Sequence, residues 1–241
     1  MRKDESEINK VYDSSADKYY EKRYEGTIHN TFIANPAIRT LLKNVKGKRL
    51  LDIGCGFGED LKYFSNKGAK VVGVELNKKL IKIAKQDPEL EKVVILQGSI
   101  YHLNLKEKFD ICLANLVLDQ VQNLREAFSN VNRALKKNGE FIFSVAHPLN
   151  CATRNYSKEL SDYFTPRKSF FYPKSIGKVP FYYRNFDEYS KIIDDSGFLI
   201  KRILEPKPLK EAKKFFNRDY NLFNKLPDIL IMSLVKHKSS K

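Results

Sequence analysis

Apolar and polar residues alternate along the chain in a way that predicts strands separated by helices. Short apolar runs that end in glycine or polar residues are typical of strands buried on both faces, as in parallel sheets. Five such runs cover residues 49–53, 70–75, 93–96, 109–114 and 140–146. Between them, apolar residues spaced by three and four predict amphipathic helices, most firmly over 124–135, where Asn138-Gly139 is expected to end the helix. This alternation predicts an α/β fold with helices on both faces of a mostly parallel sheet.

Both ends of the chain add elements to this pattern. Residues 7–22 carry one apolar and aromatic helical face, and a second helix is expected over 36–45, with Pro36 in its first turn. Near the other end, Asn185 and Glu188 resemble a capping box for a helix that stops at Gly197. Strands are then expected at 198–204 and 228–235, with a helix near 209–216 between them.

One long segment, 148–185, shows little periodicity and is rich in aromatic residues and proline. A loop of this length inside a compact domain is usually functional. We interpret it as an insertion that covers a substrate pocket; a small structural hairpin is the alternative.

Composition places the chain among soluble globular proteins, with 241 residues, 42% hydrophobic and 30% charged. The net charge of +15 indicates either a nucleic-acid or acidic partner or lysines scattered over a solvated surface. We favour scattered lysines, because no single segment holds the charge. Nucleic acid therefore remains a possible but not a favoured partner.

The cysteines and the hydropathy indicate which bonds, metal sites and locations to expect. Cys55, Cys112 and Cys151 are odd in number and far apart, which argues against a disulfide framework and against a zinc site. We expect no metal, and a reducing cytoplasm is the simplest location. No apolar run approaches transmembrane length, so we expect no membrane association. We expect the protein to be a monomer or a homodimer.

The candidate chemistry centres on the segment Leu51-Asp52-Ile53-Gly54-Cys55-Gly56-Phe57-Gly58. Glycine after a strand lets the backbone approach a ligand closely, because it has no Cβ. The spacing is G-x-G-x-G, whereas a dinucleotide site has G-x-G-x-x-G or A, and the sixth position here is Glu59. A carboxylate at the helix start would repel a pyrophosphate, so we expect a ligand without phosphates.

This segment closely resembles the first motif of class I S-adenosylmethionine-dependent methyltransferases. The resemblance to their small-molecule group extends over nearly the whole chain and is strongest from Leu50 to His147. It implies one Rossmann-like domain over 1–241, with a doubly wound seven-stranded sheet of order 3-2-1-4-5-7-6 whose last strand is antiparallel. It also implies that helices in 1–45 close over the cofactor and that 148–185 is a lid inserted after strand 5.

The resemblance implies S-adenosyl-L-methionine as cofactor and S-adenosyl-L-homocysteine as product. Glu75, about twenty residues past the first glycine, is placed to accept hydrogen bonds from both ribose hydroxyls. Ser99 stands where the family usually has an Asp that binds the adenine amino group, and a hydroxyl accepts that bond more weakly. The expected cofactor-binding residues are Tyr20, Asp52, Gly54, Cys55, Gly56, Glu75, Leu76, Ser99, Ile100, Asn115 and Leu116.

Methyl transfer to a neutral hydroxyl or amine also requires that a proton leave. His147, at the exit of strand 140–146, is the candidate base or substrate hydrogen-bond partner, although a His-Pro pair can simply shape a turn. Tyr12 and Tyr20 are candidates for cation–π contact with the sulfonium. The expected substrate-binding residues are Tyr12, His147, Tyr172 and Arg184.

Four functions stay open at this point. The first is a methyltransferase that acts on oxygen or nitrogen of a small molecule, and the second is an RNA (tRNA) methyltransferase, favoured by the charge of +15. After the strand over 109–114, relatives that methylate DNA bases have an Asn or Asp followed by Pro-Pro-Tyr or Pro-Pro-Phe. This chain lacks that motif, which counts against base amino-methylation. The others are a nicotinamide-dependent dehydrogenase and a non-catalytic cofactor-binding protein.

Overall fold

The computed structural model describes residues 1–241 except 104, 154–162, 174–175 and 238–241. Its main sheet has seven strands in the order β3-β2-β1-β4-β5-β9-β8. The strands are β1 (Arg49–Ile53), β2 (Lys70–Glu75), β3 (Val94–Gln97), β4 (Phe109–Asn115), β5 (Leu135–Ala146), β8 (Phe198–Leu204) and β9 (Ile229–Lys236). Strands β1 to β5 pair in parallel, and β9 runs antiparallel to both β5 and β8. The predicted order and the antiparallel last strand are confirmed.

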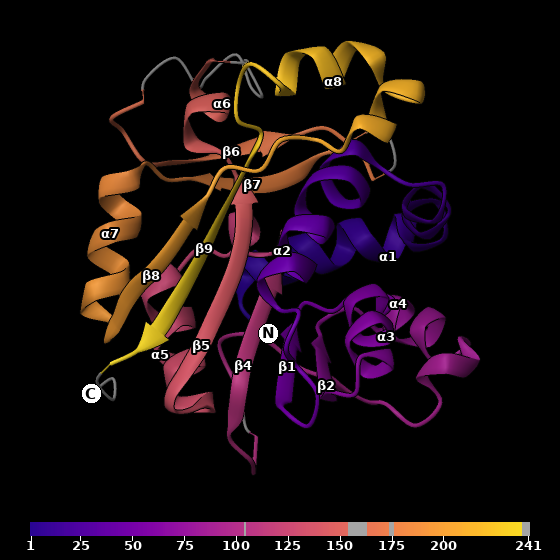
Figure 1. Cartoon of the computed structure of the whole chain (residues 1–241), viewed down its shortest axis with the longest axis vertical. Coiled ribbons are helices and arrows are strands. Elements are labelled where there is room, and N and C mark those ends of the chain that lie inside the picture. Colours follow the sequence, from indigo (N-terminus) through magenta and orange to yellow (C-terminus); the bar gives the residue numbers. More distant parts are fainter. Residues whose placement is uncertain (104, 154–162, 174–175, 238–241) are drawn as a thin grey trace.

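Helices cover both faces of this sheet (Figure 1). The α-helices are α1 (Lys3–Tyr24), α2 (Asn35–Leu41), α3 (Glu59–Asn66), α4 (Lys78–Ala84), α5 (Leu124–Ala134), α6 (Pro148–Thr153), α7 (Phe186–Asp195) and α8 (Asn217–Phe223). Side chains of β1 alternate between two cores: Leu51 and Ile53 pack with α5 and α7, whereas Leu50 packs with α2. Burial on both faces explains why the β1 segment is almost continuously apolar.

Several boundaries differ from the predicted ones. Helix α1 begins at Lys3, and a π-helical turn, η1 (Asn30–Ala34), leads directly into α2. Helix α5 ends at Ala134, four residues before the Asn138-Gly139 pair, because Leu135 is extended and pairs with Phe109 of β4. The helix expected near 209–216 is a 3₁₀ segment, η4 (Lys210–Lys214), followed by α8. Two further 3₁₀ turns are η2 (Pro88–Leu90) and η3 (Leu118–Gln120).

The segment 148–185 contains α6 and a hairpin of β6 (Arg167–Phe171) and β7 (Val179–Tyr183). Its residues 154–162 and 174–175 lie outside the described residues. The hairpin, α6 and α8 lie beyond the end of the sheet to which β5 points (Figure 1). These elements therefore stand at the edge where open α/β sheets bind their ligands. In the described part of the chain, no helix is both long enough and apolar enough to span a membrane.

Candidate functional site

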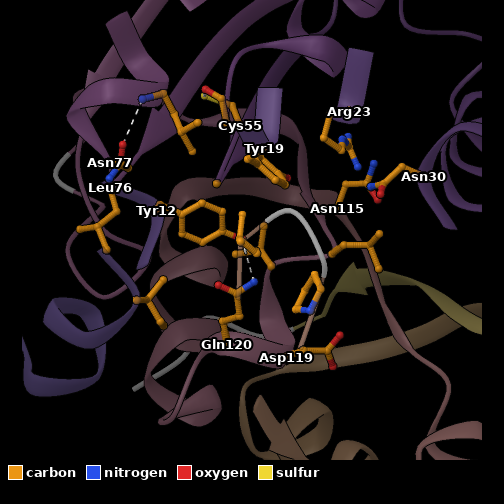
Figure 2. Close-up of a pocket in the computed structure, with 18 of the residues that line it drawn as sticks. Tyr12, Tyr19, Arg23, Asn30, Cys55, Leu76, Asn77, Asn115, Asp119 and Gln120 are labelled. Atoms are coloured by element: carbon orange, nitrogen blue, oxygen red, sulfur yellow. Dashed lines mark hydrogen bonds between the residues drawn. The ribbon is translucent and has the colours of Figure 1, made fainter. Parts of the chain in front are cut away.

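A cavity of about 830 Å³ opens at the carboxyl ends of the parallel strands. Its wall comes from α1, the turn after β1, the ends of β2 and β4, the loop after β3, the hairpin and α8. Figure 2 shows side chains from several of these elements converging on the same space. The sheet, its N-terminal helix and the inserted hairpin thus share one site.

The turn after β1 gives the cavity a wall of bare backbone. Gly54 and Gly56 have φ angles of 70° and 56°, a left-handed conformation that glycine adopts without strain. A Cβ on Gly54 would lie 2.5 Å from Val117 Cγ2, whereas a Cβ on Gly56 would meet nothing within 4 Å. Both glycines line the cavity, so a ligand can rest directly on the main chain at Gly56.

Two carboxyl groups flank this turn. Glu75 Oε2 accepts a hydrogen bond from the Gly56 N–H at 2.9 Å, and its Oε1 accepts one from the Asn77 N–H at 2.8 Å. Burial raises the pKa of Glu75, and the backbone hydrogen bonds oppose that rise. Burial also raises the pKa of Asp52, followed by repulsion from Asp60 and Glu75. A ligand that donates hydrogen bonds would relieve the desolvation of both groups.

An unsatisfied donor and an unsatisfied acceptor also line the cavity. Arg23 Nε and Asp60 Oδ1 are buried without a hydrogen-bond partner among the described residues. Their other atoms are engaged: the Arg23 guanidinium donates to Glu59 at 2.7 Å, and Asn115 Nδ2 donates to Asp60 Oδ2 at 2.8 Å. A ligand with a carboxylate and an ammonium, such as an α-amino acid group, would satisfy both atoms.

The turn after β4 is strained where it meets the cavity. Leu116 has a φ angle of 58°, which costs a non-glycine residue about 1–3 kcal/mol. Its N–H donates to Ser144 Oγ at 2.9 Å, and that hydroxyl donates to Asn115 Oδ1 at 2.6 Å. Asn115 and Leu116 both line the cavity, as expected from the sequence.

The loop after β3 is joined to the first turn of α1. The Ser99 hydroxyl donates to the Glu5 carboxylate and accepts from the Tyr101 N–H at 3.0 Å. Ile100 is buried beside them, and all of these residues line the cavity. Ser99, which stands where the family usually has an Asp, therefore has the Glu5 carboxylate of α1 next to it. Cys55 and Leu76 complete this side of the cavity.

Tyrosines of α1 form the roof. Tyr12 lines the cavity and its hydroxyl accepts from Gln120 Nε2 at 3.1 Å (Figure 2). Tyr19, whose ring lies 5.3 Å from that of Tyr12, is also in the wall. Tyr20 is not among the lining residues and packs on Phe57. Tyr19 could have been found from the sequence, because it is seven residues from Tyr12 on the same helical face.

Two of the expected substrate residues lie behind the cavity wall. His147 is 2% exposed and its Nε2 lies 2.7 Å from Glu205 Oε1; burial lowers its pKa and Glu205 opposes that. Arg184 donates to the carbonyl oxygens of Val121 and Tyr182, at 2.6 and 3.1 Å. Neither is among the lining residues, whereas Tyr172 of the hairpin turn is. The functions expected for these residues remain predictions.

Asp119, His29 and Asp228 are among the lining residues that the sequence interpretation did not select. Asp119 accepts from the Ala146 N–H at 2.8 Å, and burial raises its pKa to about 7 (Figure 2). His29 Nδ1 lies 2.5 Å from Asp228 Oδ2. No local pattern indicates this last pair, because its members are 199 positions apart. Within the described ranges, no group of three or more His, Cys, Asp or Glu could hold a metal ion.

Comparison with known proteins gives both family and structural matches. Residues 51–143 match the family described as "Methyltransferase domain". An uncharacterized protein of Haemophilus influenzae is 33% identical over 151 residues, which cover 58% of this chain and 59% of that protein. A ubiquinone biosynthesis O-methyltransferase of Pelagibacter ubique is 34% identical over 131 residues, covering 54% of this chain and 53% of the enzyme. The chain thus spans little more than half the length of these curated relatives.

Among solved structures, a candidate S-adenosylmethionine-dependent methyltransferase of Listeria monocytogenes superposes with a TM-score of 0.72. It is 26% identical, and the match covers 85% of this chain and 97% of that one. The similarity therefore includes the N-terminal or C-terminal elements beyond residues 51–143, and not the central sheet alone.

Proposed function

We propose, since this chain belongs to the class I S-adenosylmethionine-dependent methyltransferases, that it transfers a methyl group to an oxygen or nitrogen atom of a small molecule. The observation that supports this most is the cavity beside the bare turn at Gly56. Carboxylates, an unsatisfied donor and an unsatisfied acceptor line that cavity together.

The chain's residues suit each part of the cofactor. Glu75 would accept hydrogen bonds from the ribose, and Gly56 lets the nucleoside lie against the backbone. Arg23 and Asp60 would pair with the carboxylate and ammonium of the methionine part. When bound, the cofactor supplies an activated methyl group on a sulfonium. The protein's task is then to orient the acceptor and keep water out.

The far side of the cavity suits an apolar or aromatic acceptor. Phe171, Tyr172 and Phe181 of the hairpin, together with Phe223 of α8, line it. Rings of this kind exclude water, and holding the acceptor in line can supply on the order of 7–11 kcal/mol of the barrier. A volume of about 830 Å³ lies within the range of about 300–1,000 Å³ that is usual for small-molecule sites. The ubiquinone-pathway relative, an O-methyltransferase, also supports a small acceptor.

Binding of S-adenosylhomocysteine tests this proposal directly. At a concentration of 100 Kd it should raise the melting temperature by about 5–10 °C, whereas NAD should leave it unchanged. Gly56→Ala should abolish the rise, because its Cβ would fill the space above the turn. Gly47→Ala is the matched control: it has a φ angle of 76°, open space and no place in the cavity wall, so it should lose similar stability and keep the rise.

A wild-type protein that NAD stabilises and S-adenosylhomocysteine does not would instead favour a dehydrogenase. If Gly56→Ala binds as tightly as the wild type, the cofactor lies elsewhere.

A further inference from the structure

The acceptor side of the cavity contains a histidine held by a buried carboxylate. His29 precedes η1, lines the cavity and keeps 42% of its side chain exposed. Its ring packs against Phe223, with centroids 5.6 Å apart. Asp228, just before β9, lines the same cavity and its side chain is 1% exposed. Elements from opposite ends of the sequence thus meet at one point of the wall.

The hydrogen bonds determine which ring nitrogen carries the lone pair. Asp228 Oδ1 accepts from Asn150 Nδ2 at 2.7 Å, and Oδ2 lies 2.5 Å from His29 Nδ1. An ionised carboxylate only accepts hydrogen bonds, so Nδ1 of His29 carries the hydrogen. The lone pair of the neutral ring is then on Nε2. Asp228 fixes both the tautomer and the orientation of the ring.

We propose that His29, oriented by Asp228, accepts the proton of the methyl acceptor, which is therefore a hydroxyl or an amine that carries a hydrogen. This inference rests on the proposed function. The acceptor's oxygen or nitrogen forms a bond to the methyl carbon while the carbon–sulfur bond breaks and leaves its electron pair on sulfur. The proton passes from the acceptor to His29 Nε2, and the Asp228 carboxylate stabilises the resulting imidazolium. Water then receives the proton.

Other groups in or behind the cavity wall are less suited to accept this proton. His147 is buried behind the wall and bonded to Glu205. Asp119 of η3 lines the cavity, but its Oδ2 already accepts a hydrogen bond from the Ala146 N–H. Arg218 and Asp219 of α8 also line the cavity, and both belong to the element whose Phe223 contacts His29. The charged groups that line the cavity together with His29 thus include Asp228, Asp119, Asp219 and Arg218.

The test uses the full chain with labelled S-adenosylmethionine and a panel of defined acceptors: catechol, phenol, a primary amine, a secondary amine and a carboxylate. His29→Asn should lower kcat for the best acceptor by about 10²–10⁴ and leave stabilisation by S-adenosylhomocysteine intact. Asp228→Asn should lower kcat less and move the acid limb of the kcat profile to lower pH, because it removes the anion that favours the imidazolium. His102→Asn, on an exposed position outside the cavity, is the matched control and should keep kcat.

The possible outcomes separate this inference from the proposed function. If the wild type methylates a panel member and His29→Asn keeps kcat within threefold, His29 is not the base. If Asp119→Asn abolishes methyl transfer and His29→Asn does not, the base is Asp119. The inference that the acceptor carries a proton would be overturned if only the carboxylate is methylated. It would also be overturned if no panel member is methylated while S-adenosylhomocysteine still binds. A wild type that does not bind S-adenosylhomocysteine would overturn the proposed function itself.

Discussion

Asp119 shows how burial in the cavity wall changes a single residue. The residue is 8% exposed, and burial raises its pKa to about 7. In the unfolded chain an Asp has a pKa of about 3.9, so between pH 4 and 7 the folded protein holds a proton that the unfolded chain releases. Ionisation of Asp119 therefore reduces the stability of the fold as the pH rises through this window.

Asp119→Asn should remove this pH dependence, because an amide does not ionise and its oxygen can still accept from the Ala146 N–H. Its gain in free energy of unfolding over the wild type should be about 2–3 kcal/mol larger at pH 8 than at pH 5. Urea denaturation at the two pH values measures the difference, and Asp17→Asn on the exposed face of α1 is the control. Equal gains at both values would contradict the raised pKa.

At this scale, the sequence predicted the residues that lie close to the glycine turn. Asp52, Gly56 and Glu75 follow from the ends of adjacent strands, whose positions periodicity reveals. His29 and Asp228 could not be predicted in this way, because only the complete sheet brings them together. His147 was singled out for its place after β5, but its orientation depends on packing against Glu205, which no local pattern encodes.

Helix α1 is the element that completes the cavity, and Asn77 is one of the side chains that connect it to the rest of the fold. Asn77 Oδ1 caps α4 by accepting from the Lys79 N–H, while its Nδ2 donates to Asn9 and Asp13 of α1 at 2.9 and 2.8 Å. The same residue therefore begins one helix and holds another over the site.

Asn77→Ser separates these two tasks, because serine can cap a helix but has no amide to reach α1. Losing two hydrogen bonds, worth about 1 kcal/mol each, should speed hydrogen exchange in α1 by roughly 5–30-fold and leave α4 protected. Asn77→Ala should loosen both helices. Mass spectrometry of exchange in peptides from α1 and α4 measures this, and unchanged exchange in α1 would show that Asn77 does not hold it.

The elements themselves were predictable where periodicity and caps agree. Strands β1 to β4, α5 and α7 were expected close to their observed bounds, and Asn185 does cap α7. Strand β5 begins at Leu135, five residues before the expected start at 140. The hairpin was expected only as the alternative for 148–185, and its bounds were not predicted, because β6 and β7 show no clear alternation. The expected helix over 36–45 begins at Asn35, directly after a π-helical turn, and ends early at Leu41.

Charge is distributed unevenly over the molecule as a whole. The chain carries +15, yet its cavity is lined by more carboxylic acids than basic side chains. The acids are Asp4, Glu5, Asp52, Glu59, Asp60, Glu75, Asp119, Asp219 and Asp228, against Lys22, Arg23 and Arg218. An acidic cleft attracts cationic ligands, does not repel neutral ones, and repels phosphates. The excess of Lys and Arg lies outside the site.

We therefore expect RNA to bind only weakly and without entering the cavity. Filter binding with mixed tRNA should show an affinity that falls by about 10³–10⁵ between 50 and 200 mM salt if six to ten phosphates are contacted. S-adenosylhomocysteine should not change it, and no labelled methyl group should enter the RNA. Tight binding at 200 mM salt together with methyl incorporation would support the RNA alternative.

The position of β9 has a consequence for biosynthesis. This strand follows all other strands of the main sheet in the sequence, yet it lies between β5 and β8 and hydrogen-bonds to both. On the ribosome, β8 is translated before β9, but it has no strand of the sheet to pair with until residues 229–236 emerge from the exit tunnel. Asp228 arrives at the same moment, so the His29–Asp228 pair forms only once this last strand is available.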